Sequence, residues 1–147
     1  MTKMISILIA LLLVSPVLAV SEPTFAELAV FCAKGYFKEY IPADASLDRC
    51  VIFLNEKGIC ISLFDLMDAE VKVTQEDFAR VVGQSTLLFL GEEELVRGCI
   101  KRPKDAKSWV DYCLLNDVSL KNLWSRLVLQ VENGAFPEVD VFFGGGS

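Results

Sequence analysis

The side chains of this sequence that could do chemistry are carboxylates and thiols, because the chain contains no histidine. Without imidazole groups, Ser-His-Asp and Cys-His nucleophile systems and histidine zinc sites are excluded. Two carboxylates at a suitable separation could still hydrolyse a glycoside. The acidic side chains gather in two places, at residues 92–94 and at Asp65, Asp68 and Glu70.

Both acidic clusters have an explanation that requires no catalysis. The triplet at 92–94 opens a segment that ends in Lys101 and Arg102, the order of charges that a helix dipole favours. The cluster around Asp65 lacks the glycine and the alternating ligands of an EF-hand. The sequence also lacks a nucleophile elbow, a phosphate loop and a dinucleotide fingerprint. It therefore predicts a chain that is not an enzyme, with no catalytic, cofactor-binding or metal-binding residues.

Thiols are the second reactive group, and all of them follow residue 19. An oxidising compartment would favour two disulfides and one unpaired thiol, although the sequence alone does not choose the pairs. The unpaired thiol could be buried, or it could link two copies into a homodimer. No spacing matches a CxxC metal or redox motif. The disulfide candidates are Cys32, Cys50, Cys60, Cys99 and Cys113.

The N-terminal residues predict export. Lys3 precedes an apolar run at 4–14, and Ser15 and Pro16 interrupt it before the small residues that signal peptidase accepts. We expect a signal peptide at 1–19, cleaved after Ala19, and no stable membrane insertion afterwards, because the run is shorter than a helix that spans a bilayer. The predicted location is secreted or periplasmic.

The remaining chain has the length of one domain, and its charge indicates a class of partner. We expect a single helical domain at 20–134 and an extended tail at 135–147 that ends in a glycine-rich, linker-like segment. Removal of residues 1–19 takes away Lys3 and no acid, so the formal charge changes from −6 to −7. An acidic chain would be repelled by nucleic acid, whereas it could attract a basic protein surface.

Apolar residues recur at helical spacing over most of the domain, which predicts an all-α fold. The expected architecture is a compact bundle of about six to seven short helices, stapled by disulfides. Residues 60–69 are expected as a central, largely buried helix, and 92–102 as a fifth helix. Gly83 within the fourth helix predicts close packing or a weak point, and both tryptophans are expected in the core. The segments expected as helices begin at Thr24, near Asp44, at Cys60, Thr74, Glu92, Asp105 and Ser119, and the last one ends at Gly134.

Two segments resemble parts of a known family. Residues 60–69 (CISLFDLMDA) with 73–82 (VTQEDFARVV) are similar to the helix-linker-helix segment of small periplasmic immunity proteins that neutralise type VI secretion amidases. Residues 28–36 (LAVFCAKGY) resemble the cysteine-bearing first helix of such proteins. The resemblance implies a disulfide-stapled helical protein that binds and blocks a toxin or enzyme.

The residues themselves also favour binding over catalysis. The aromatic residues Tyr36, Phe37 and Tyr40 precede Pro42 in a predicted loop, and we expect them to belong to a partner interface, because aromatic residues are enriched at interaction hot spots. One alternative is a small helical carrier of an apolar ligand, and another is a secreted effector. The ligand cavity of a carrier could be lined by Phe25, Phe31, Phe53, Phe64, Phe78 and Phe89.

Overall fold

The computed structural model describes residues 22–68 and 70–133. This part of the chain contains six α-helices and one two-stranded antiparallel sheet. The predicted signal peptide and the predicted tail lie outside the described residues. The elements are α2 (Phe25–Tyr36), α3 (Leu47–Glu56), α4 (Leu63–Met67), α5 (Gln75–Leu90), β1 (Leu95–Val96), β2 (Cys99–Ile100), α6 (Trp109–Leu115) and α7 (Leu120–Asn133).

The strongest capping signals in the sequence start their helices where expected. The backbone N–H of Thr24 donates to Oε1 of Glu27 at 3.0 Å, and the N–H of Glu27 donates to Oγ1 of Thr24 at 3.2 Å. This reciprocal capping box satisfies two N–H groups that have no partner within α2. Thr74 caps α5 by accepting the N–H of Asp77. The predicted starts at Thr24 and Thr74 are confirmed.

Two other helices start later than the sequence predicted, because a serine caps each of them. Ser46, and not Asp44, accepts a backbone N–H at the start of α3. At α6 the cap is Ser108, and not Asp105, with the N–H of Asp111 donating at 3.0 Å. Each serine lies directly before the first helical residue, where a short side chain reaches the N–H groups of the first turn.

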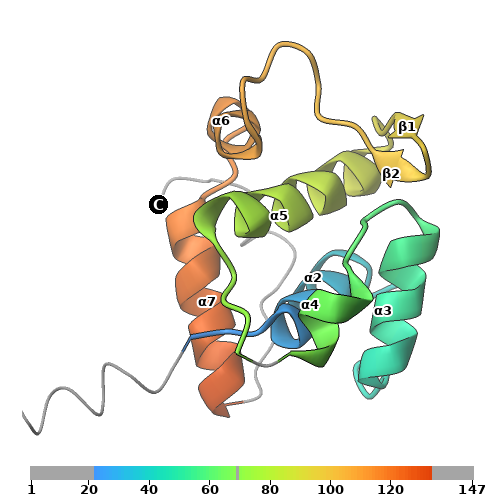
Figure 1. The fold of residues 1–147 in the computed structure, drawn as a ribbon, viewed down its shortest axis with the longest axis vertical. Helices are drawn as coiled ribbons and strands as arrows, with labels where there is room; N and C mark the ends of the chain where they lie inside the picture. Colours follow the sequence, from blue (N-terminus) through green and yellow to red (C-terminus); the bar gives the residue numbers. More distant parts are fainter. Residues whose placement is uncertain (1–21, 69, 134–147) are drawn as a thin grey trace, which may run out of the picture.

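Helix α5 is the centre of the fold. It crosses the molecule with α6 and the hairpin on one side and α2, α3, α4 and α7 on the other (Figure 1). It packs against α2 and α6, and α2 packs against α3 and α7. The buried side chains form one hydrophobic cluster that includes Trp109, and Trp124 packs against it at the edge of Phe78. The expectation that both tryptophans serve the core is confirmed.

Gly83 allows α6 to approach α5 closely. A Cβ atom at this position would lie only 2.6 Å from Cε3 and 3.0 Å from Cζ3 of Trp109. Glycine in a helix interior costs about 1 kcal/mol of stability relative to alanine. At this position the absence of a side chain leaves room for the indole ring of Trp109. The close packing predicted at Gly83 is therefore present.

The prediction of a helix at 92–102 is wrong, because this segment is a β-hairpin. Leu95 pairs with Ile100 and Val96 with Cys99. The turn residues Arg97 and Gly98 have φ values of 52° and 81°, the pair of positive angles that a type I′ hairpin turn requires. The order of charges in residues 92–102 suited a helix dipole. Gly98, however, allows the turn of the hairpin, and a disulfide from Cys99 to Cys60 holds the second strand.

The prediction of a buried helix at 60–69 is also wrong. Helix α4 has only five residues, and none of them is buried. Ser62 caps its start, and Asp68 ends it in an extended conformation. Leu63, Phe64 and Met67 therefore face solvent, whereas the apolar pattern had suggested a core element. In the same segment Ile61 is buried and Leu66 packs against the core.

Candidate binding surfaces

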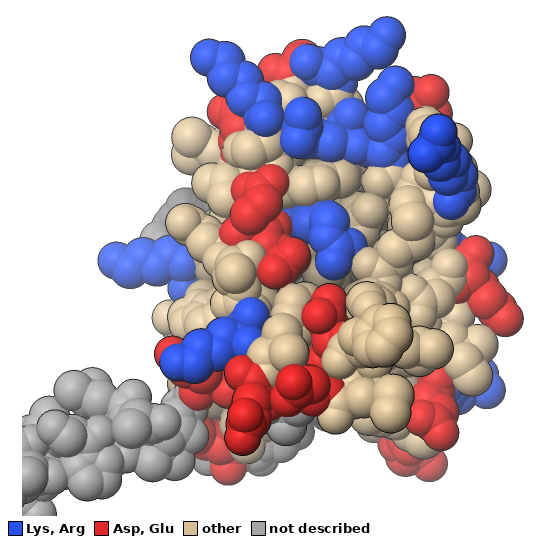
Figure 2. Space-filling model, viewed as in Figure 1, with Lys and Arg blue, Asp and Glu red and all other residues tan. Residues whose placement is uncertain are grey.

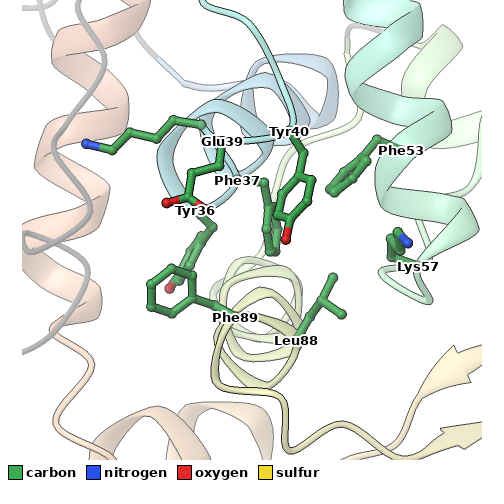
Figure 3. Close-up of a pocket in the computed structure, with 9 residues that line it drawn as sticks. Tyr36, Phe37, Glu39, Tyr40, Phe53, Lys57, Leu88 and Phe89 are labelled. Carbon is green, nitrogen blue, oxygen red and sulfur yellow. The ribbon is translucent and has the colours of Figure 1, made fainter.

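One surface is a hollow of about 650 Å³, which we call the aromatic groove. It lies where the end of α2 and the following loop meet α3 and the last turn of α5. Figure 3 shows its aromatic side chains arranged around the opening, with Leu88 and Phe89 contributed by α5. Its lining residues are Tyr36, Phe37, Lys38, Glu39, Tyr40, Phe53, Lys57, Leu88 and Phe89.

The rings of the groove contact one another in a continuous set. Tyr40 stacks on Phe53 with ring centroids 6.2 Å apart, and Phe37 lies 5.2 Å from Phe53. On the other side Phe89 meets Tyr36 edge-on at 6.0 Å. The exposed fraction rises from 5% at Phe37 to 67% at Tyr40. The groove therefore has a buried floor and an exposed rim, and it can take an apolar group between aromatic walls.

The polar groups of the groove lie at its floor and its mouth. The hydroxyl of Tyr36 is 2.7 Å from Oγ1 of Thr86, and burial raises the pKa of Tyr36 well above its usual value. The floor is therefore neutral at physiological pH. At the mouth the ammonium group of Lys57 lies 5.9 Å from the centroid of the Phe53 ring. Lys57, Lys38 and Glu39 supply the charges of the lining.

The structure brings together the three residues expected in an interface. Tyr36, Phe37 and Tyr40 all line the groove, although Tyr36 and Phe37 are buried and only Tyr40 is widely exposed. Whether they contact a partner stays a prediction.

The ligand cavity expected for a carrier differs from the aromatic groove in its lining residues. Six phenylalanines were expected to line the cavity of a carrier. Of these six, only Phe53 and Phe89 line the aromatic groove. Phe25, Phe31 and Phe78 fill the hydrophobic core, and Phe64 faces solvent. The helical spacing of these residues correctly predicted apolar helix faces. It could not distinguish residues packed in the core from residues that line a cavity.

The second surface is the α4 knob, which consists of Leu63, Phe64 and Met67. Their exposed fractions are 68%, 84% and 84%. Large apolar side chains are rarely so exposed in a group, and such patches mark interaction sites. Sequence reasoning missed this surface because the apolar run was interpreted as core.

The base of the knob is tied to the rest of the fold by a covalent bond and by hydrogen bonds. A disulfide joins Cys60, just before α4, to Cys99 of β2. Nη1 of Arg80 on α5 donates to the carbonyl of Cys60 at 2.6 Å and to Oε1 of Gln84 at 3.0 Å. Gln84 in turn donates to the carbonyl of Ile100 at 2.9 Å. The exposed knob therefore projects from an anchored base.

The charge around the knob is negative. Between residues 59 and 71 the sequence has Asp65, Asp68 and Glu70 and no lysine or arginine. In Figure 2 acidic side chains gather in the lower half of the face on which α4 lies, whereas lysines and arginines gather along the top. Burial lowers the pKa of Arg80 beneath the knob, and nearby Asp77 and Asp65 oppose that shift. Asp65 therefore has a cation beside it, while the outer face of the knob stays acidic.

The five disulfide candidates form one bridge and not two. Cys32, Cys50 and Cys113 are free and buried. Burial raises the pKa of the Cys32 and Cys113 thiols to about 12 each. The second expected disulfide is replaced by thiols that pack as small apolar side chains, which is a common role for buried cysteine. None of the three is exposed for a covalent link between copies.

The two acidic clusters lie on different elements of the fold. Residues 92–94 are exposed in the segment before β1, whereas Asp65 lies in α4 and Asp68 and Glu70 follow it. Within 22–68 and 70–133, no group of three Cys, Asp or Glu side chains is arranged to hold a metal ion. Over the same residues, no helix has both the length and the apolar character needed to cross a membrane.

No protein family matches the chain, and neither a curated protein nor a solved structure has significant similarity to it.

Proposed function

We propose that this chain is a non-enzymatic protein-binding module, an inhibitor or immunity protein that blocks a toxin or an enzyme. The observation that carries the proposal is the α4 knob, three large apolar side chains that are each at least two-thirds exposed. Interfaces concentrate their binding energy in a few apolar anchors that enter pockets on the partner. The three side chains of the knob are exposed enough to act as such anchors.

The anchored base supports the same function. A flexible apolar loop would lose conformational entropy on binding, and a segment that is already ordered loses less. The Cys60–Cys99 disulfide and the hydrogen bond from Arg80 supply that order. Because Asp65, Asp68 and Glu70 surround the knob, the matching surface is an apolar pocket with a basic rim, which would also speed association.

The proposed compartment is the periplasm or the outside of the cell, after cleavage near Ala19. A structural disulfide is typical of oxidising compartments, which supports this location. The segments that resemble periplasmic immunity proteins include α4 and the first part of α5, so the resemblance and the knob point to the same region.

The test is native mass spectrometry of the tagged chain, recovered gently from its own secretion compartment. The expected result is an added mass of protein size that is lost when Phe64→Ser and Met67→Ser are combined. Because both side chains are exposed, the variant should fold normally. A matched control, Leu114→Ser, removes an apolar side chain of α6 that is 74% exposed, and it should keep the partner. A partner retained equally by all three proteins would contradict binding through the knob.

The aromatic groove favours a second candidate, a carrier of an apolar molecule. Its volume of about 650 Å³ lies in the range of sites that hold small ligands. In this case native mass spectrometry would show an added mass of a few hundred daltons, and organic extraction would recover a stoichiometric compound. A secreted effector would bind through the same knob as an inhibitor, and the identity of its partner would distinguish it.

A further inference from the structure

The walls of the aromatic groove specify the kind of segment that would fill it. Tyr40 and Phe53 stand on one side and Phe89 on the other, so aromatic side chains can enter between them (Figure 3). Lys57 at the mouth favours a carboxylate near the apolar part of the occupant. The groove therefore suits a segment that carries adjacent aromatic residues with acidic residues close by.

The chain itself contains such a segment after α7. Residues 135–143 read AFPEVDVFF, with Phe142 and Phe143 adjacent, Glu138 and Asp140 before them, and no lysine or arginine. Pro137 disfavours continuation of the helix, and the following residues have a strand-like pattern. The structure does not describe this segment, and its chemistry complements the groove in both apolar and charged groups.

We propose that the aromatic groove binds residues 137–143 of the same chain, with Phe142 and Phe143 between its rings and the carboxylates of Glu138 and Asp140 toward Lys57. This inference goes beyond the proposed function and does not depend on it, since the knob is a separate surface. It assigns the groove a resident peptide, so a diffusible ligand would have to displace that peptide.

The length of the segment sets how far Phe143 can reach from α7. Phe143 follows the last residue of α7 by ten positions, which in extended form reach about 33 Å. That is longer than α7 itself, whose fourteen residues extend about 21 Å. Helix α7 packs on α2, which supplies Tyr36 to the groove. A tether of this length gives an effective concentration near the millimolar range, which favours the same chain over a second copy.

The experiment labels the full chain with 3-fluorotyrosine and records its ¹⁹F spectrum. The three tyrosines report on different places, since Tyr36 and Tyr40 line the groove and Tyr112 packs against Trp109. Combined Phe142→Ser and Phe143→Ser should move the Tyr40 resonance and leave that of Tyr112 unchanged. Phe64→Ser, which removes a phenyl ring from the knob, should move neither resonance.

A charge exchange provides a second variant that does not alter apolar packing. Lys57→Glu should move the Tyr40 resonance in the same direction as the tail substitutions. Adding Glu138→Lys and Asp140→Lys to that variant should restore the resonance toward its original position. A simple perturbation by the new glutamate would show no such rescue.

Stability gives an independent readout of the same contact. The two tail substitutions should raise the unfolding equilibrium constant about fivefold to tenfold in the wild-type groove, as expected for lost aromatic pairs. In a chain that also carries Tyr40→Ser and Phe53→Ser, the increase should be about twofold or less.

The inference is overturned if the tail substitutions leave the Tyr40 resonance in place and their effect on stability is the same with and without the Tyr40→Ser and Phe53→Ser substitutions. It is also overturned if the resonance changes on tenfold dilution of the wild-type chain, because the occupant would then be a second copy.

Discussion

The α4 knob and the aromatic groove are both built from large apolar side chains, yet one projects into solvent and the other recedes beneath its rim. The knob has exposed fractions of 68% to 84%, and its neighbours are acidic. The groove has a buried floor at Tyr36 and Phe37, and lysines belong to its lining. The difference indicates opposite roles, since a projecting surface enters a partner and a hollow receives a segment.

The two regions also rest on different kinds of support. A disulfide and a hydrogen bond from Arg80 hold the base of the knob, and none of the five residues of α4 is fully buried. The groove is part of the hydrophobic core, where Phe37 packs on Phe53 and Tyr36 contacts Thr86. Changes that destabilise the core should therefore alter the structure of the groove more than that of the knob. Removal of the disulfide should alter the knob more than the groove.

The largest expected effect is alkaline unfolding of the core beneath the groove. The folded pKa of about 12 at Cys32 and Cys113 lies above the ordinary value of 9.0. Below pH 9 both states hold these protons, and above it the unfolded chain loses protons that the folded chain keeps. The free energy of unfolding should fall between pH 9 and 12, by up to about 1.4 kcal/mol per pH unit for each thiol.

Urea unfolding followed by tryptophan fluorescence from pH 8 to 11 measures this slope. Cys32→Ala should reduce the slope, whatever it does to stability at pH 8. A free energy of unfolding that stays constant up to pH 11 would contradict the burial of these thiols.

The next effect concerns the support of the knob. Combined Cys60→Ser and Cys99→Ser should lower the free energy of unfolding by about 2 to 4 kcal/mol, because the bridge closes a loop of 39 residues. Amide hydrogen exchange should increase in α4 and the hairpin more than in α2. Reduction of the wild-type chain is the matched control. Equal acceleration of exchange throughout the chain would mean that the bridge supports the whole core.

A third prediction compares the same substitution on the two surfaces. Phe53→Ala should destabilise the chain by about 1 to 2 kcal/mol, since Phe53 is half-buried and contacts Phe37 and Tyr40. Phe64→Ala should change stability by less than about 0.5 kcal/mol, because its ring is 84% exposed. Thermal or urea unfolding of the two variants tests the comparison, which fails if Phe64→Ala costs as much as Phe53→Ala.

The smallest effect is expected at Arg80. Arg80→Met keeps much of the apolar stem and removes the hydrogen bond to the carbonyl of Cys60, which should cost about 1 kcal/mol. Exchange should increase at residues 60–67 while the ¹⁹F resonance of Tyr40 stays in place. Lys101→Met, which removes a cation from the hairpin segment, serves as the control. A shift of Tyr40 would show that the two surfaces are coupled through α5.

The parts of the fold that could be predicted from sequence are those with local causes. The capping residues Thr24 and Thr74 start their helices through hydrogen bonds within one turn. The hairpin could not be separated from a helix by charge order, because its stability depends on a disulfide and on a hydrogen bond from Ile100 to Gly58. Such contacts between distant segments leave no periodic signal in the sequence.

The binding surfaces were predicted unevenly for a similar reason. Aromatic enrichment identified Tyr36, Phe37 and Tyr40, which the groove brings together. Phe53 and Phe89 were expected in a cavity with core residues, since helical spacing gives a face but not its depth. The knob was missed altogether because Leu63, Phe64 and Met67 have the pattern of a buried helix, whereas α4 has only five residues and leaves all three exposed.

The Cys60–Cys99 bridge also sets an order of events during folding. Helix capping and the packing of α2 on α3 involve residues close in sequence, which form contacts in microseconds to milliseconds. Oxidation of two thiols 39 residues apart takes seconds to hours. The knob is therefore the last surface to mature, and a newly made chain holds a folded core well before it presents a finished α4.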